Sequence, residues 1–154
     1  MLDITILAIG KIKERYFQDA YCEFLKRLNP YIKINIQELA HKSFFNNDQE
    51  KIKKEEGKKI IKYLDKYSQK KIIVLDERGD NMTSEKFSVF LFKIKEPIIF
   101  VLGGSLGLSK EVLSRADYKI ALSQMTFPHE LARVVLVEQI YRAITIEKGK
   151  NYHL

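Results

Sequence analysis

In the first third of the chain, the spacing of apolar residues is that of a strand, then of a helix, and then of a second strand. Asp3 to Ile9 is rich in β-forming residues and is closed by Gly10, which predicts a strand. From Glu14 to Leu28 apolar residues recur every three or four positions until Pro30 interrupts them, which predicts an amphipathic helix. Tyr31 to Leu39 alternates isoleucines with polar residues, so we expect a half-exposed strand near a sheet edge.

The middle of the chain continues this alternation of elements. His41 to Asn47 reads as a polar loop, and Asp48 to Tyr67 as a lysine-rich helix with a narrow apolar face. Lys71 to Asp76 contains a continuous apolar run and is expected to be a strand, as buried parallel strands have such runs. Glu77 to Asn81 has turn composition, and Ser84 is expected to cap a helix that runs through Phe92.

The C-terminal part adds two more strand and helix pairs. A strand from Ile98 leads into a glycine-rich loop and a helix from Ser109 to about Arg115. The strand Tyr118 to Ser123 and a long helix from Pro128 to about Lys148 follow. This order predicts a single α/β domain over residues 1–154, with a mostly parallel sheet and helices on both faces.

Two of the loops suggest a ligand crevice. Gly103, Gly104 and Gly107 allow positive φ angles and a close approach to the main chain. This loop and the segment from Leu122 to Pro128 both leave the carboxyl ends of parallel strands, where α/β proteins bind ligands. Main-chain groups there can pair with the edge of a base. Four apolar side chains are placed to flank its faces: Leu75, Leu122, Met125 and Phe127.

Other chemistries find little support in the sequence. The glycines match neither the P-loop nor the dinucleotide-binding spacing, and the nucleophile motif of serine hydrolases is absent. His41, His129 and His153 have no metal-ligand spacing, so we expect no metal site. The single cysteine, Cys22, excludes an internal disulfide, and its place in an amphipathic helix favours a packing role.

The charge of the chain favours a polyanionic partner. The formal net charge is +7 and the isoelectric point is about 9.3, which makes RNA a more natural partner than a membrane, although a lysine-rich genome gives the same composition. The N-terminus lacks the features of a signal peptide, and no segment approaches the roughly 20 apolar residues of a membrane span. We therefore expect a cytoplasmic protein.

The last helix is apolar on nearly every side. Because one sheet covers only one side of a helix, we expect a homodimer with this helix in its interface. Glu138 and Arg142 are four residues apart and are expected to pair; His129 and Arg133 share that spacing on roughly the opposite face. From spacing alone, the Glu138–Arg142 pair fits a structural or interface ion pair as well as a functional one.

Several ordered motifs resemble those of one family. They are Phe100-Val-Leu-Gly-Gly-x-x-Gly-Leu, Leu122-Ser-x-Met-Thr-Phe-Pro-His129, the helix from Arg133 to Arg142, and the terminal Tyr152-His153. Together they resemble the RlmH (YbeA-like) family of SPOUT-class methyltransferases over the full length of the chain. The resemblance implies an α/β fold with a C-terminal trefoil knot, a homodimer, and S-adenosyl-L-methionine as cofactor. It also implies methylation of N3 of a pseudouridine in 23S rRNA on assembled ribosomes.

The same resemblance assigns residues to the site. The implied cofactor positions are Leu75, Gly103, Leu122, Ser123, Gln124, Met125, Thr126 and Phe127. Arg142, His153 and Tyr152 are the implied catalytic residues: the arginine stabilises negative charge, the histidine acts as a base or holds the target base, and the tyrosine stacks on it. The chain departs from many relatives by ending at Leu154, without a basic residue after Tyr-His.

Three other functions compete with this reading. A non-enzymatic RNA- or ribosome-binding protein accounts for the basic charge, and a SPOUT methyltransferase acting on another RNA accounts for the motifs. A nucleotide-binding regulator with a different adenine ligand accounts for the crevice alone. Binding of the cofactor would distinguish the methyltransferase from the non-enzymatic RNA-binding protein. Incorporation of methyl groups would distinguish it from both the RNA-binding protein and the regulator, but not from a methyltransferase that acts on another RNA.

Overall fold

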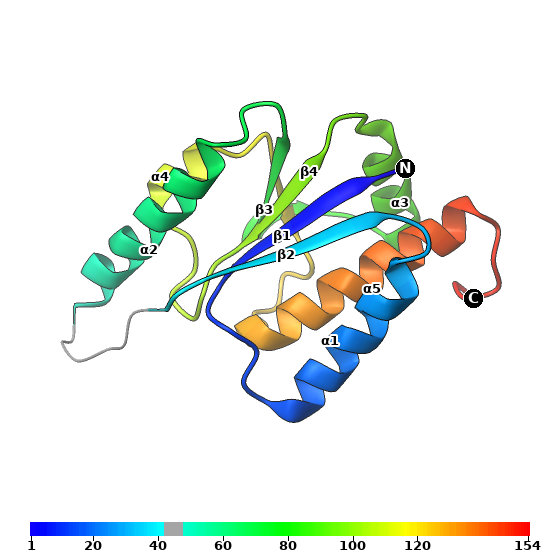
Figure 1. The fold of residues 1–154 in the computed structure, drawn as a ribbon, viewed down its shortest axis with the longest axis horizontal. Coiled ribbons are helices and arrows are strands. Elements are labelled where there is room, and N and C mark those ends of the chain that lie inside the picture. The colour runs from blue at the N-terminus through cyan, green and yellow to red at the C-terminus, as the bar shows by residue number, and fades with distance from the viewer. Residues whose placement is uncertain (42–47) are drawn as a thin grey trace.

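The protein has a five-stranded, all-parallel sheet at its centre (Figure 1). The computed structural model describes residues 1–41 and 48–154, so the predicted polar loop after His41 lies largely outside the described residues. The strand order is β2-β1-β4-β3-β5, which confirms that the 31–39 segment forms an edge strand. The strands are β1 Asp3–Ile9, β2 Lys33–Leu39, β3 Lys71–Asn81, β4 Ile98–Leu102 and β5 Tyr118–Ala121.

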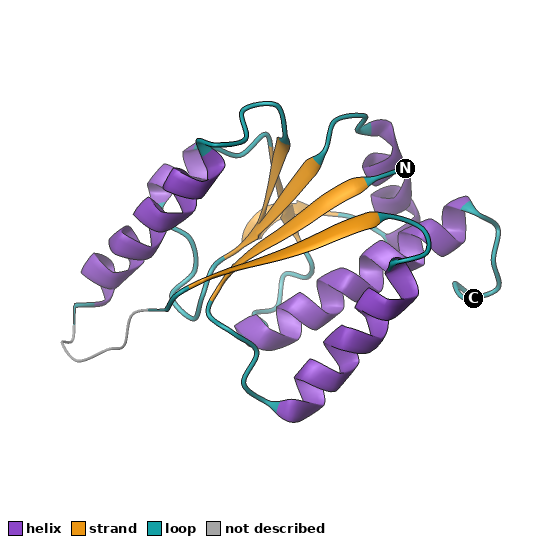
Figure 2. Cartoon of the chain, in the orientation of Figure 1, coloured by secondary structure: helices purple, strands orange, loops and turns teal. Residues whose placement is uncertain are grey.

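Helices cover both faces of this sheet, as the alternating pattern predicts (Figure 2). One face packs against α1, α3 and α5, and the other packs against α2 and α4. The helices are α1 Arg15–Leu28, α2 Gln49–Leu64, α3 Ser84–Lys93, α4 Lys110–Ser114 and α5 His129–Glu147. The trefoil knot implied by the family resemblance stays a prediction.

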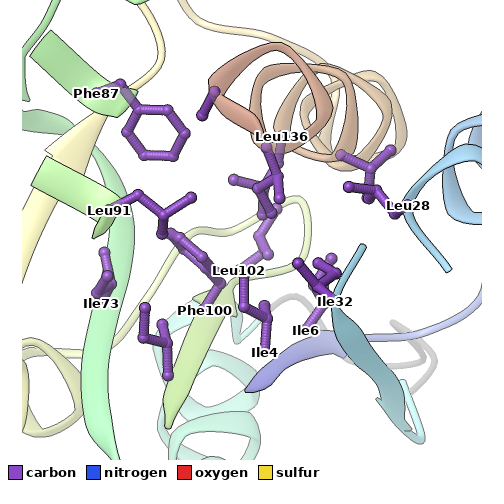
Figure 3. Close-up of a cluster of buried hydrophobic side chains, with 14 of the residues drawn as sticks. Ile4, Ile6, Leu28, Ile32, Ile73, Phe87, Leu91, Phe100, Leu102 and Leu136 are labelled. Atoms are coloured by element: carbon purple, nitrogen blue, oxygen red, sulfur yellow. The ribbon is translucent and has the colours of Figure 1, made fainter. Parts of the chain in front are cut away.

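The central strand β4 anchors both halves of the core. Ile98, Phe100 and Leu102 point toward the α1, α3 and α5 side, where Phe100 packs near Phe87 and Leu91 (Figure 3). The two residues between them face α2 and α4, and all five are at most 3% exposed. A strand buried on both faces is held firmly, so the glycine loop that follows it starts from a fixed point.

The turn predicted at residues 77–81 is wrong, because β3 continues as a strand to Asn81. Its pairing with β5 is interrupted between Leu75 and Asp80 and then resumes. Gly79 makes this return possible: a Cβ there would lie 2.7 Å from the Ile120 backbone. The turn-like composition therefore marks a bulge in a strand rather than its end.

Side chains cap the starts of α2, α3 and α4, with one correction to the expected residues, whereas α1 and α5 have no side-chain cap. The Asp48 and Ser109 side chains accept hydrogen bonds from the first turns of α2 and α4. The residue that caps α3 is Thr83, whose Oγ1 accepts from the Lys86 N–H at 3.2 Å, and not Ser84. The Ser84 hydroxyl instead donates to Gln139 on α5 at 2.8 Å, which ties α3 to α5.

The long helix α5 is covered by more than the sheet, because α1 and α3 pack along its two sides. A half-buried stripe nevertheless remains along it, which includes Leu131, Val135, Glu138 and Arg142. Residues three to four apart share a helix face, so these side chains form one continuous surface. The homodimer stays a prediction, and this stripe is the surface that it would cover.

Three further expectations concern single features. Cys22 is exposed, so the predicted packing role is wrong: its neighbour Tyr21 takes the inward position on α1 and is 6% exposed. Among the helices of residues 1–41 and 48–154, none is long and apolar enough to cross a membrane. Within the same residues there is no cluster of three or more histidine, cysteine or acidic side chains that would hold a metal ion.

Candidate active site

A crevice opens at the carboxyl ends of β3, β4 and β5, where the sequence predicts it. Its volume is about 510 Å³, within the range of small-molecule sites. The end of β3, the loop after β4 and the β5–α5 loop form its walls. Its lining includes Leu75, Leu102, Gly103, Leu122, Thr126 and Phe127.

The glycine loop forms one wall, and its shape depends on the absence of side chains. A Cβ on Gly103 would lie 2.7 Å from the carbonyl carbon and oxygen of Gly107. The Gly107 N–H donates to the Gly104 carbonyl at 3.0 Å, and Gly107 has a φ of 76°. The loop is thus a tight turn folded back on itself, with main-chain groups rather than side chains presented to a ligand.

The β5–α5 loop forms the facing wall and is fixed by two hydrogen bonds. The Ser123 hydroxyl accepts from the Met125 N–H at 3.0 Å, which holds the start of the loop in a local turn. The Thr126 hydroxyl donates to the Glu77 carboxylate at 2.7 Å, which ties this loop to the far end of β3. Pro128 then forms the N-cap of α5, which begins at His129. The wall formed by the β5–α5 loop is therefore linked directly to the wall formed by β3.

The end of β3 and the β5–α5 loop give the crevice apolar surface beside an ion pair. Leu75 and Phe127 are half-buried, which leaves apolar surface for a flat ring. Asp76 lies beside them, and its pKa is below the usual value: burial opposes ionisation, but hydrogen bonds from Arg78 outweigh it. Such a site suits a ligand that carries an aromatic base and polar groups.

The structure brings together seven of the eight predicted cofactor residues. Gln124 is the exception, since it is exposed and does not line the crevice. Met125 is 76% exposed, so its side chain reaches the crevice from the rim. Sequence reasoning missed Lys53 and Glu77, which line the crevice from α2 and from the extended part of β3. Nothing in the local pattern around either residue distinguishes it from an ordinary surface charge.

The three predicted catalytic residues form a separate cluster near the C-terminus. Glu138 Oε1 accepts from Arg142 Nε at 2.9 Å and from Arg142 Nη2 at 2.5 Å, which confirms the pair expected from their spacing. The Tyr152 hydroxyl donates to the same oxygen at 3.1 Å, and the Arg142 guanidinium lies 4.8 Å from the Tyr152 ring centroid. These contacts hold the end of the chain against α5.

His153 lies between a cation and an anion. Its Nδ1 is 3.2 Å from Arg142 Nη1, and its Nε2 is 2.8 Å from Glu85 Oε1. An arginine only donates hydrogen bonds, so Nδ1 accepts, and the neutral ring carries its proton on Nε2 and donates it to Glu85. Hydrogen bonds from the Glu85 backbone N–H, and then from His153, lower the pKa of Glu85 to about 2. Glu85 is remote in sequence, and no local signal predicts this contact.

The crevice and the C-terminal cluster lie at opposite ends of α5. Ala132 lines the crevice, whereas Arg142 lies ten residues farther along the helix, which corresponds to about 15 Å. Within one chain, the sequence-predicted cofactor and catalytic residues are thus divided between two places.

Comparison with known proteins identifies the family. The model of the family described as predicted SPOUT methyltransferases matches residues 2–153. The chain belongs to the SPOUT methyltransferase family. Full-length relatives support this: proteins named ribosomal RNA large subunit methyltransferase H are 44% identical in Clostridium kluyveri and 46% identical in Clostridium novyi, with 99% of both chains covered in each case.

Solved structures agree on the fold of this methyltransferase. A methylase family protein from Haemophilus influenzae superposes with a TM-score of 0.60, covering 100% of this chain and 72% of that one. Its sequence is only 13% identical, so the likeness concerns the fold alone. The methyltransferase thus has a SPOUT-type α/β fold, and its crevice lies at the sheet edge where such folds bind ligands.

Proposed function

We propose that this methyltransferase transfers a methyl group from S-adenosyl-L-methionine to N3 of a pseudouridine in 23S rRNA on assembled ribosomes. The observation that carries the proposal is the crevice, which gathers seven of the eight residues expected at the cofactor position. The full-length relatives named as large-subunit rRNA methyltransferases support the choice of RNA. A ribosomal substrate agrees with a cytoplasmic location.

The crevice residues fit S-adenosyl-L-methionine. Leu75, Leu122 and Phe127 offer apolar surface to the adenine, while the main chain of the glycine loop offers hydrogen-bonding groups without steric hindrance. Asp76, paired with Arg78, adds polar groups to the same crevice. When bound, this cofactor supplies the electrophilic methyl group. The protein holds it by both walls and keeps it aligned with the target nitrogen.

The distance along α5 supports a site shared between two subunits. An antiparallel pair of α5 helices would bring the Arg142 end of one chain beside the crevice end of the other. The half-buried stripe from Leu131 to Arg142 is the surface through which such a pair would pack. The homodimer would then complete the active site, because neither chain places all of the predicted residues together.

The C-terminal residues have roles that follow from their chemistry. N3 of pseudouridine becomes nucleophilic only after losing its proton, and the negative charge then spreads over the ring. Arg142 is permanently charged and is suited to stabilise that charge. The Nδ1 of His153 can accept a proton only after Arg142 turns toward the substrate, because Arg142 occupies that lone pair in the free chain. Tyr152 offers an aromatic face to the base.

The proposal is tested by incubating the protein with labelled S-adenosyl-L-methionine and ribosomes that lack the modification. Digestion of the rRNA and mass spectrometry of its nucleosides should then detect N3-methylpseudouridine. Since the small chain offers only its own surface for recognition, protein-free rRNA should be a poor substrate. Label in another nucleoside would show that the substrate is not this pseudouridine. Absence of label, despite cofactor binding, would favour another RNA.

A further inference from the structure

The loop between β1 and α1 carries a group of uncompensated positive charges. Lys11, Lys13 and Arg15 are all exposed. Within the described residues, none of the three has a carboxylate within 4.0 Å of its charged group. Glu14 is the only acidic residue in this short segment, so its formal charge remains positive.

The backbone of this loop is nevertheless held firmly. The Glu130 carboxylate on α5 accepts hydrogen bonds from the backbone N–H groups of Lys13 at 2.6 Å and Glu14 at 3.1 Å. Ile12, between the two lysines, is 6% exposed, and its carbonyl accepts from the Gln18 side chain at 2.6 Å. Glu130 therefore satisfies main-chain donors, while the lysine side chains remain directed to solvent.

A buried arginine fixes the start of the same loop. Arg133 on α5 is 2% exposed, and its Nη1 donates to the Gly10 carbonyl at 3.1 Å. Its Nη2 donates to Glu38 at 2.9 Å, which links the ends of β1 and β2. Burying an arginine is costly unless it is paired and hydrogen-bonded, so the contacts of Nη1 and Nη2 fix the position of the loop, although Nε has no hydrogen-bond partner among the described residues. The cations are presented by a preorganised backbone, which lowers the entropic cost of binding a partner.

The loop lies at the same edge of the sheet as the crevice. β1 and β4 are neighbouring parallel strands, and both end at this edge. The side chain of Ile9, just before the loop, lies 3.5 Å from the position of a Cβ on Gly104. The basic loop therefore continues the protein surface from the glycine loop that forms one wall of the crevice.

We propose that the β1–α1 loop (residues 10–15) binds phosphates of the RNA backbone and holds the RNA beside the crevice. This inference rests on the proposed function, from which the polyanion is RNA. Lysines on a rigid loop act as point charges for phosphates and read no base sequence. The loop thus contributes affinity and orientation, while the fit of the target base into the active site determines which nucleotide reacts.

The test is a double variant, Lys11→Ala with Lys13→Ala. A matched control, Lys62→Ala with Lys66→Ala, removes two equally exposed lysines beyond the opposite, amino-terminal edge of the sheet. Ribosome affinity, the KM for ribosomes, kcat and cofactor affinity are measured for both at two salt concentrations. The loop variant should bind ribosomes about tenfold more weakly, with a shallower salt dependence, because two phosphate contacts are lost. Its kcat and cofactor affinity should stay unchanged.

A charge-conserving variant, Lys11→Arg with Lys13→Arg, should retain the affinity of the natural chain. Equal losses in the loop variant and the control would overturn the inference, since any two lysines would then matter alike. Failure of the proposed function is seen separately, as an absence of methyl transfer by the natural chain. In that case, the direct affinity measurement still decides whether the loop binds RNA.

Discussion

Gly103 and Gly104 are adjacent, yet alanine should be damaging at the first position and tolerated at the second. A Cβ on Gly103 would lie 2.7 Å from two backbone atoms of Gly107, which cannot rotate away as a side chain can. A Cβ on Gly104 would find its nearest neighbour, a methyl carbon of Ile9, at 3.5 Å. That distance is an ordinary van der Waals contact, and Gly104 does not have a positive φ.

The expected magnitudes follow from these distances. Gly103→Ala must push the two sides of the turn apart, and such overpacking typically costs about 1–3 kcal/mol. If the displaced loop fits the cofactor less well by the same amount, the Kd rises by roughly five- to more than a hundredfold. Gly104→Ala should change the unfolding free energy by less than about 1 kcal/mol, because a less flexible unfolded chain offsets small adjustments.

Urea unfolding and calorimetric titration with S-adenosyl-L-methionine measure both quantities. Gly104→Ala is the matched control, because it adds the same methyl group one residue away. If Gly103→Ala remained as stable as the natural chain and bound the cofactor equally well, the tight turn would not shape the site. Equal losses of stability and of cofactor affinity in the two variants would likewise contradict a special role for the turn at Gly103.

Three further predictions concern the contacts of α5 and the tail. Arg133→Lys should lower the unfolding free energy, measured in urea, by about 1–3 kcal/mol, because a lysine cannot donate to both strand ends as the planar guanidinium does. An unchanged unfolding free energy would refute this. Because hydrogen bonds from its own backbone N–H, and then from His153, lower the pKa of Glu85 from 4.5 to about 2, the stability that these bonds give is present above about pH 4.5 and is lost as the pH falls toward 2. Glu85→Gln should remove that pH dependence of the unfolding free energy, measured in urea, and an identical pH dependence in both proteins would contradict it. Deleting residues 152–154 should abolish methyl transfer but keep cofactor binding and the dimer, and unchanged transfer would exclude the tail from catalysis.

The central part of the fold is predictable from the sequence because its signals are local. The run from Ile98 to Leu102 is apolar without interruption, as a strand covered on both faces must be, and the glycines after it mark the turn. Capping residues such as Asp48 and Ser109 also act within one turn of their helices. The crevice follows from the parallel order, since strand ends that share an edge bring their loops together.

The remaining features depend on contacts between distant segments. Residues 77–81 have turn composition, but the approach of β5 to Gly79 keeps them in the sheet. The bond between Glu85 and His153 spans 68 positions in the sequence, and no periodicity encodes such a pair. Cys22 lies in a helix whose pattern predicts a buried face, but the pattern does not show which of two neighbouring residues lies on that face. Tyr21 lies on it, and Cys22 is exposed.

In the proposed dimer, the methyl donor binds in the crevice of one chain, and Arg142 and His153 of the other chain complete the active site around it. Mixed dimers of a Gly103→Ala chain and an Arg142→Ala chain test it most directly, by label transferred from S-adenosyl-L-methionine to ribosomal RNA. At a low donor concentration each variant alone should be much less active than the natural chain, because Gly103→Ala binds the donor weakly and Arg142→Ala lacks the stabilising charge. After random mixing, half of the dimers are mixed and each has one complete site of two, so activity should return to about a quarter of the natural level. No recovery, with mixed dimers shown to form, would mean that each chain carries its own complete site and would contradict the account.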